Sequence, residues 1–218
     1  MNKTIWMCWF QGEEDNSLSE LNRKCINRWR QLNPTWQVNV LSDKTIAEYV
    51  PEYFEIIKNS RRRQMQKKSD LLRLLLLSKF GGVWVDASVY PMMGLNEFYN
   101  KIVNETGFFA YRFIPRGGYR GTNKCETTSW FLCSNVQEHY LIENWKKLFI
   151  EKFKKMKIMR YFELHETLTD LYDTDDKVKY IIDNMIQIDE KIPHSACGKN
   201  IKKSYLYKRP NLKNLNDE

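Results

Sequence analysis

The segment from Lys68 to Pro91 reads KSDLLRLLLLSKFGGVWVDASVYP. Its leucines leave almost no polar face, so we expect a helix that is buried nearly all round and that encloses the charges of Asp70 and Arg73. Gly81-Gly82 is expected to end this helix, and the β-branched and aromatic residues that follow predict a short buried strand. Asp86 then lies at the carboxyl end of the strand, where open α/β sheets bind their ligands.

These three charged residues have a structural interpretation and a functional one. Asp70 could cap the helix or pair with Arg73, which lies three residues further along and therefore on the same face. Asp86 could merely start a turn. Charges are costly to bury unpaired, however, and ionisable groups enclosed beside a crevice are typical of functional sites. We therefore expect Asp70, Arg73 and Asp86 to converge on one crevice.

The rest of the chain predicts strands and helices on both sides of this segment. Before it, we expect strands over 4–10 and 36–40, and helices over 17–32 and 42–59, the second of which Pro51 divides. This alternation predicts parallel pairing with right-handed crossovers, as in a Rossmann-like half. After it, we expect strands over 107–113 and 129–133, and helices over 136–157, 161–171 and 177–185.

Length, charge and cysteine content limit the class of protein. The 218 residues, of which 42% are hydrophobic, can bury one sizeable core, so we expect one domain over 1–218. A net charge of +8 suits polyanions, anionic lipid or phosphate-bearing substrates. The five cysteines are odd in number and include no Cys-x-x-Cys pair, which argues against a disulfide framework and a zinc site. A reducing compartment is favoured.

No segment of the sequence is typical of a membrane anchor. The amino terminus offers no apolar stretch long enough for secretion or anchoring. The leucine run is interrupted by Arg73 and Lys79 and is too short to span a bilayer. We expect a cytoplasmic protein, which could act at the inner face of the membrane.

The segment 68–91 resembles the donor-site block of the DXD-containing glycosyltransferases. These include the initiating mannosyltransferases of fungi, the clostridial glucosylating toxins and, closest of all, the bacterial capsular polysaccharide synthesis transferases. TIWMCWFQGEEDN at 4–16 and KCINRWRQLNPTWQVNVLSD at 24–43 are similar to the opening of the same capsule family. The resemblance implies a single-domain, GT-A-like α/β fold with a mixed central sheet flanked by helices. Residues 1–91 are expected to bind the nucleotide sugar, and 92–218 to form the acceptor half with a basic tail.

The resemblance also implies roles for individual residues. Asp70 and Arg73 are expected to hold hydroxyls of the donor sugar, and Asp86, the first acid of the DXD, to contact ribose, sugar and metal shell. These three are the expected catalytic residues. A carboxylate beside an arginine fork can both accept from and donate to sugar hydroxyls, which fits this task. The other donor-binding positions implied are Trp9, which stacks on the nucleobase, and Gln11, Gly12, Gly82, Trp84 and Ser88.

The sequence departs from the DXD pattern at Ser88, where the second carboxylate is expected. A hydroxyl is a weak ligand for Mg²⁺ or Mn²⁺, which prefer carboxylate, phosphate and water oxygens. Two alternatives follow. Either water and the donor's diphosphate complete a metal shell around Asp86, or a cationic side chain replaces part of the metal's task.

Three further basic segments have uses that the sequence leaves open. The loop 115–128 could contact acceptor or phosphate, or be a solvated hairpin loop; its basic residues are Arg116, Arg120 and Lys124. The cluster Arg61-Arg62-Arg63 with Lys67-Lys68 is most simply a solvated face, although it could hold the protein near anionic lipid. By resemblance, one residue of the basic tail assists the leaving group; the candidates are Lys199, Lys202, Lys203, Lys208 and Arg209.

His165 and His194 are isolated, and each is interpreted as a packed or exposed histidine.

Two functions are compatible with these features. The first is transfer of a hexose, with retention, from a nucleotide sugar such as UDP-Gal or UDP-Glc to a capsular or other surface polysaccharide, free or lipid-linked. The second is a non-catalytic basic module that binds nucleic acid or anionic lipid. Two buried carboxylates would repel phosphates in such a module, so the first function, with no nucleic-acid partner, is favoured.

Overall fold

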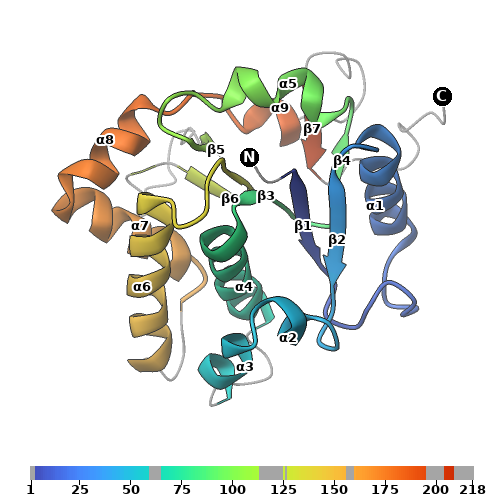
Figure 1. Cartoon of the computed structure of the whole chain (residues 1–218), viewed down its shortest axis with the longest axis horizontal. Helices are drawn as coiled ribbons and strands as arrows, with labels where there is room; N and C mark the ends of the chain where they lie inside the picture. The colour runs from blue at the N-terminus through green and yellow to red at the C-terminus, as the bar shows by residue number, and fades with distance from the viewer. Residues whose placement is uncertain are drawn as a thin grey trace.

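A mixed sheet forms the centre of the computed structural model, which describes residues 3–58, 65–112, 125, 127–155, 160–194 and 204–208 (Figure 1). Its five strands are β1 (Thr4–Cys8), β2 (Gln37–Leu41), β3 (Gly82–Val85), β5 (Phe108–Arg112) and β6 (Thr127–Ser134), in the order β2-β1-β3-β6-β5. β1 pairs in parallel with β2 and β3, whereas β6 pairs antiparallel with β3 and β5. The predicted α/β class and the parallel pairing of the first three strands are confirmed.

Helices cover both faces of this sheet. They are α1 (Glu20–Leu32), α2 (Ile46–Tyr49), α3 (Glu52–Ile57), α4 (Met65–Phe80), α5 (Leu95–Ile102), α6 (Tyr140–Lys155), α7 (Glu163–Thr174), α8 (Asp176–Asn184) and α9 (Lys191–His194). Pro51 separates α2 from α3 as predicted. Within the described ranges, we find no helix with the length and apolar character needed to cross a bilayer.

Alternate side chains of each strand enter two different cores, because successive residues of a strand point to opposite faces. On β3, Trp84 joins the apolar cluster that includes residues of α4 and α6. Val83 and Val85 join the cluster that includes residues of α1 and α5. With both faces covered, the strand is apolar along its whole length.

Helix α4 is enclosed as predicted, since every residue from Asp70 to Ser78 is buried. Gly81 ends the helix with a φ of +65°, and its N–H donates to the carbonyl of Leu77 at 2.9 Å. This left-handed ending is the geometry that glycine permits at little cost. Strand β3 begins at the next residue, so Asp86 leaves the sheet directly after Val85.

The start of α1 differs from the prediction. The helix begins at Glu20 rather than near residue 17, and the Ser19 hydroxyl accepts from the N–H of Asn22 at 3.2 Å. Ser17 instead belongs to a turn, where its N–H donates to Asp15 at 2.8 Å and its hydroxyl accepts from Trp9 at 3.3 Å. Two serines suited to capping lie two residues apart, and the tertiary contact with Trp9 decides between them.

Four elements were missing from the predicted pattern: β4 (Val89–Pro91), α5, α9 and β7 (Leu206–Lys208). Helix α5 does carry a helical signal, because Leu95, Phe98, Tyr99 and Ile102 are its buried residues and lie at helical spacing. β4 and β7 are three residues long and form an antiparallel pair that joins residues more than a hundred positions apart. Strands this short carry little local signal, so their pairing follows from the tertiary structure.

Gly82 permits the close approach of β3 to β1. Its φ is +89°, and a Cβ at this position would lie 2.5 Å from the Thr4 carbonyl oxygen. Gly12 has a similar φ of +95°, but a Cβ there would meet only the Ser42 Cβ, at 3.8 Å. Of these two positions, only Gly82 is one where a larger residue would be strained by the positive φ and would also clash with the backbone.

We expect Gly82→Ala to lower the free energy of unfolding by about 3 kcal/mol and Gly12→Ala by about 1 kcal/mol. An alanine is strained by the positive φ at both positions, but only at position 82 does its Cβ also clash with the backbone. Urea denaturation followed by tryptophan fluorescence measures both. Equal losses in the two variants would contradict the packing explanation for Gly82.

Candidate functional site

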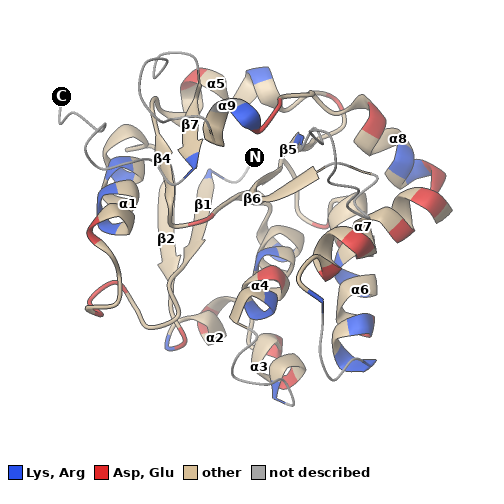
Figure 2. Ribbon diagram, turned by 180° about the vertical axis from the view of Figure 1, so that it is seen from behind, with Lys and Arg blue, Asp and Glu red and all other residues tan. Residues whose placement is uncertain are grey.

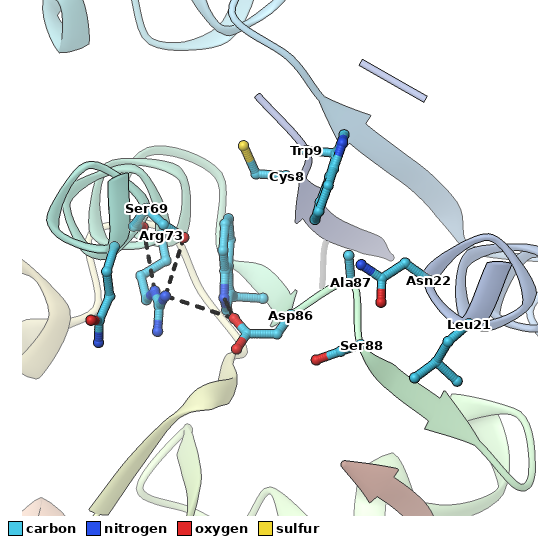
Figure 3. Close-up of a pocket in the computed structure, with 11 residues that line it drawn as sticks. Cys8, Trp9, Leu21, Asn22, Ser69, Arg73, Asp86, Ala87 and Ser88 are labelled. Carbon is cyan, nitrogen blue, oxygen red and sulfur yellow. Dashed lines mark hydrogen bonds and ion pairs between the residues drawn. The ribbon is translucent and has the colours of Figure 1, made fainter. Parts of the chain in front are cut away.

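A cavity of about 470 Å³ opens at the carboxyl ends of β1 and β3, between α1 and α4 (Figure 3). Its lining consists of Cys8, Trp9, Leu21, Asn22, Gln66, Ser69, Arg73, Trp84, Asp86, Ala87 and Ser88. Five of the predicted site residues therefore meet here, namely Trp9, Arg73, Trp84, Asp86 and Ser88. This edge of the sheet is the one at which the sequence predicts a ligand.

Asp86 is the carboxylate of the cavity. Its Oδ2 accepts a hydrogen bond from the Lys208 ammonium at 2.6 Å, and its Oδ1 accepts from the Trp84 indole at 3.1 Å and lies 3.7 Å from Arg73 Nη2. Burial alone would raise the pKa of Asp86. The positive charges of Lys208 and Arg73 together outweigh burial, so the pKa of Asp86 lies below its ordinary value. Asp86 is therefore ionised at neutral pH. Its backbone also accepts from the N–H of Val89, so it starts a turn as well.

Arg73 reaches the cavity from α4 and is held on several sides. Its Nη1 donates to the Ser129 carbonyl at 2.6 Å, and its Nη2 donates to the Ser69 hydroxyl at 3.2 Å. The guanidinium also lies over the Trp84 ring, 5.1 Å from the ring centre. Figure 3 shows its bonds to Ser69 and its ion pair with Asp86. These contacts fix the planar fork before any ligand arrives.

Asp70 lies outside the cavity lining, in contrast to the expectation that it touches the sugar. It is 1% exposed and pairs with Arg73 Nη2 at 3.2 Å and with Lys67 Nζ at 3.3 Å. Burial raises the pKa of Asp70, and the charges of Arg73 and Lys67 oppose this rise. The structural interpretation of Asp70, pairing with Arg73, is thus present in the fold.

Lys67 is buried, although the sequence indicated a solvated basic face. Besides Asp70, its ammonium contacts the backbone carbonyl of Tyr161. The spacing of three residues between Lys67 and Asp70 was the available signal. Arg61-Arg62-Arg63, from the same predicted cluster, lie outside the described residues.

Trp9 lines the cavity just beyond the end of β1 and is half-buried. Its indole donates to Ser17, so the polar atom of the ring is satisfied, and the ring forms a flat apolar part of the lining. In Figure 3, Trp9 lies on the side of β1 and Arg73 on the side of α4, with Asp86 between them. The cavity thus combines an aromatic wall, an arginine and a carboxylate.

A model of the capsular polysaccharide synthesis protein family matches residues 1–211. The chain belongs to this family. It is 31% identical over 112 residues to the O-glycosyltransferase braB of Annulohypoxylon truncatum, which covers 46% of the chain and 26% of that protein. It is also 31% identical over 104 residues to the glycosyltransferase afumC of Aspergillus fumigatus, with 43% and 26% covered. The chain spans about a quarter of the length of these curated relatives.

A solved structure supports the fold of this family member. The PaToxG glycosyltransferase matches with a TM-score of 0.52 and 17% identity, over 82% of this chain and 73% of that one. The chain has the GT-A glycosyltransferase fold, so the predicted GT-A-like architecture is confirmed.

Three other predicted positions of this capsule-family chain lie outside the lining: Gln11, Gly12 and Gly82. Gln11 is exposed, and the Gly12 N–H closes a turn with the Trp9 carbonyl at 2.8 Å. Gly82 lies at the start of β3, the opposite end of the strand from Asp86. Packing against β1 explains Gly82, and donor contacts by these three residues stay a prediction.

Of the remaining predicted residues, the basic ones apart from Lys208 lie outside the described part of the chain and the two histidines lie within it. Arg116, Arg120 and Lys124 lie outside the described residues, as do Lys199, Lys202, Lys203 and Arg209. His165 is packed near Arg73 and Lys67, and burial together with these charges lowers its pKa to about 4. His194 pairs with Glu190 at 3.2 Å and is exposed. Both histidines therefore fit the interpretation given to them.

Lys208 is the one tail candidate within the described residues, and its ammonium reaches Asp86. It lies on β7, is 7% exposed at its side chain, and its ammonium lies 5.8 Å from the centre of the Trp130 ring. The sequence could not select Lys208, because its position depends on the pairing of β7 with β4.

The residues around Asp86 do not fit a divalent metal. Oδ2 already accepts from Lys208 and Oδ1 from the Trp84 indole, and the Arg73 guanidinium lies 3.7 Å from Oδ1. The two cations, Lys208 and Arg73, would repel a metal ion. Ser88 offers only a hydroxyl. In the described ranges no three His, Cys, Asp or Glu side chains are grouped closely enough to hold a metal ion.

The lowered pKa of Asp86 makes a prediction about acid stability. A carboxyl whose pKa is lower in the folded state stabilises the fold above its unfolded pKa of about 3.9, and this contribution is lost as the pH falls through the folded value. We expect the free energy of unfolding of Asp86→Asn to fall less steeply between pH 5 and pH 3 than that of the parent. Urea denaturation at half-unit pH steps measures this, and identical slopes would refute it.

Proposed function

We propose that the chain is a hexosyltransferase that moves a hexose from a nucleotide sugar, UDP-galactose or UDP-glucose, to a capsular or other surface polysaccharide. The observation that carries this proposal is that Trp9, Arg73 and Asp86 face one cavity at the carboxyl edge of a GT-A sheet. Membership of the capsule family supports the substrate class. Both curated relatives are named glycosyltransferases, which supports the class of reaction.

Each part of the donor has a different contact in this proposal. The nucleobase stacks on Trp9, whose ring borders the cavity. Arg73 donates to sugar hydroxyls, and the ionised Asp86 accepts from sugar or ribose hydroxyls. Asp70 acts through Arg73, because it is enclosed behind that residue and paired with it. Trp84 acts in a similar way, by supporting both the Arg73 guanidinium and Asp86 Oδ1.

In the proposed reaction, the bond between the anomeric carbon and the phosphate oxygen breaks, and its electron pair leaves with UDP. A bond from the acceptor oxygen forms on the same face of the sugar, and the acceptor proton passes to the leaving phosphate oxygen. This front-face displacement retains the anomeric configuration and needs no nucleophile from the enzyme. The Cys8 thiol of the cavity lining stays protonated, because burial raises its pKa.

We assign the acceptor to a growing glycan, free or lipid-linked, and the reaction to the cytoplasmic side of the membrane. A net charge of +8 supports a peripheral association with anionic lipid. Figure 2 shows Lys and Arg on α1, α4 and α6 within the described part of the chain, so the positive charge is spread over several elements. This distribution gives no specific support to a nucleic-acid-binding module.

Nucleotide binding tests the role of Trp9. We expect Trp9→Ala to weaken the binding of UDP about tenfold and Trp9→Phe to weaken it less, because stacking of a base on an aromatic ring contributes about 1–3 kcal/mol. Tyr180→Ala is the matched control, since Tyr180 is an exposed aromatic residue outside this cavity. Isothermal calorimetry with UDP and GDP measures the affinities. Salt-sensitive binding of DNA or RNA with no nucleotide binding would favour the basic module instead.

Donor turnover tests the role of Arg73. A panel of nucleotide sugars identifies the donor by its hydrolysis, and with that donor we expect Arg73→Lys to reduce kcat about 100-fold, because lysine keeps the charge but loses the planar fork. Arg30→Lys, in an exposed pair with Glu13, is the control. The anomeric configuration of the first product is read by NMR. A glycosyl adduct trapped on an Asp or Glu would overturn the front-face mechanism.

A further inference from the structure

Five charged side chains form a continuous row from the interior of α4 to β7. They alternate in sign, and each lies within ion-pair distance of the next: 3.3 Å from Lys67 to Asp70, 3.2 Å from Asp70 to Arg73, 3.7 Å from Arg73 to Asp86 and 2.6 Å from Asp86 to Lys208. Three cations and two anions give the row a net charge of +1. We call it the charge row.

The charge row reaches the cavity at Arg73 and Asp86. Lys208 meets the row at Asp86 Oδ2, and this contact is the shortest of the four ion pairs. The side chain of Lys208 is 7% exposed and packs against the Trp130 ring, so little water screens its charge. The positive charge beside Asp86 is therefore a fixed part of the fold.

Departure of UDP from a sugar leaves negative charge on the diphosphate, and a site for this reaction must offer a cation there. In the DXD pattern, a divalent metal held by two carboxylates provides that cation. Here Ser88 stands in place of the second carboxylate, and Asp86 is already hydrogen-bonded to Lys208 and Trp84 and ion-paired with Arg73. The carboxylate that would contribute to a metal site is thus bonded to an ammonium.

We propose that Lys208 takes the place of a divalent metal beside Asp86, and that sugar transfer by this chain is independent of Mg²⁺ and Mn²⁺. The ammonium keeps the charge row positive where the leaving diphosphate gains charge, and Asp86 positions that ammonium. Lys208 lies outside the cavity lining, so its charge acts on the diphosphate electrostatically from behind Asp86, which does line the cavity. This inference rests on the proposed function.

The first test needs no substitution. UDP affinity is measured by calorimetry, and hydrolysis of the donor by UDP release, in EDTA and then with Mn²⁺ or Mg²⁺. We expect both quantities in the parent to change less than twofold. A parent that binds UDP or turns over donor only with a metal overturns the role of Lys208 but leaves the transferase intact. A parent that binds no nucleotide and turns over no donor in either condition overturns both.

Substitution of Lys208 gives the second test. We expect Lys208→Met, which keeps the apolar stem, to bind UDP at least tenfold more weakly in EDTA, and Lys208→Arg to stay within about threefold of the parent. Added Mn²⁺ should restore part of the affinity of Lys208→Met, because Asp86 then has no ammonium beside it. Lys155→Met, from an exposed pair with Glu151, is the control and should match the parent.

Two measurements separate an electrostatic role of Lys208 from a structural one. Thermal unfolding shows whether Lys208→Met keeps the fold, and the parent and Lys208→Arg decide the question if it does not. Electron paramagnetic resonance of Mn²⁺ detects a bound ion directly in the presence of UDP. We expect no bound Mn²⁺ in the parent; a bound ion that disappears in Asp86→Asn would overturn the inference.

Discussion

The fold depends on burying charges inside a helix that has no solvated side. Helix α4 packs between the sheet and α6, and it can do so only because Asp70 meets a cation on either side, Lys67 and Arg73. Removal of one member would leave an uncompensated charge in the interior. The same pairing fixes the position of Arg73 relative to Asp86, so the geometry of the cavity follows from the need to pair each buried charge with one of opposite sign.

Structural and functional interpretations of these residues are therefore compatible. Asp70 pairs with Arg73, as the structural interpretation requires, and by doing so it orients the guanidinium that faces the cavity. Asp86 begins a turn with its backbone and lines the cavity with its side chain. A site assembled from groups that are already bonded to one another needs little rearrangement when a polar ligand binds.

Local sequence predicted the features that depend on local interactions. The leucine run, the left-handed glycine after it and the carboxylate at the end of β3 could be read in order, because each follows from the periodicity or the conformation of its own neighbourhood. The enclosure of Asp70 was predicted in the same way, but that of Lys67 was not, because the sequence does not say which of several nearby basic residues will be buried beside it. The place of Lys208 was also hidden, since three-residue strands are specified by the partner they meet rather than by their own composition.

The contact between Lys208 and Asp86 joins residues 122 positions apart. A ribosome makes the chain from its amino end, so the segments that form β1, α4 and β3 are synthesised well before the strand that brings the ammonium to them. During this interval Asp86 lacks the residue that is its nearest positive neighbour in the folded chain. The ion pair between Asp86 and Lys208 consequently cannot form until synthesis has passed residue 208.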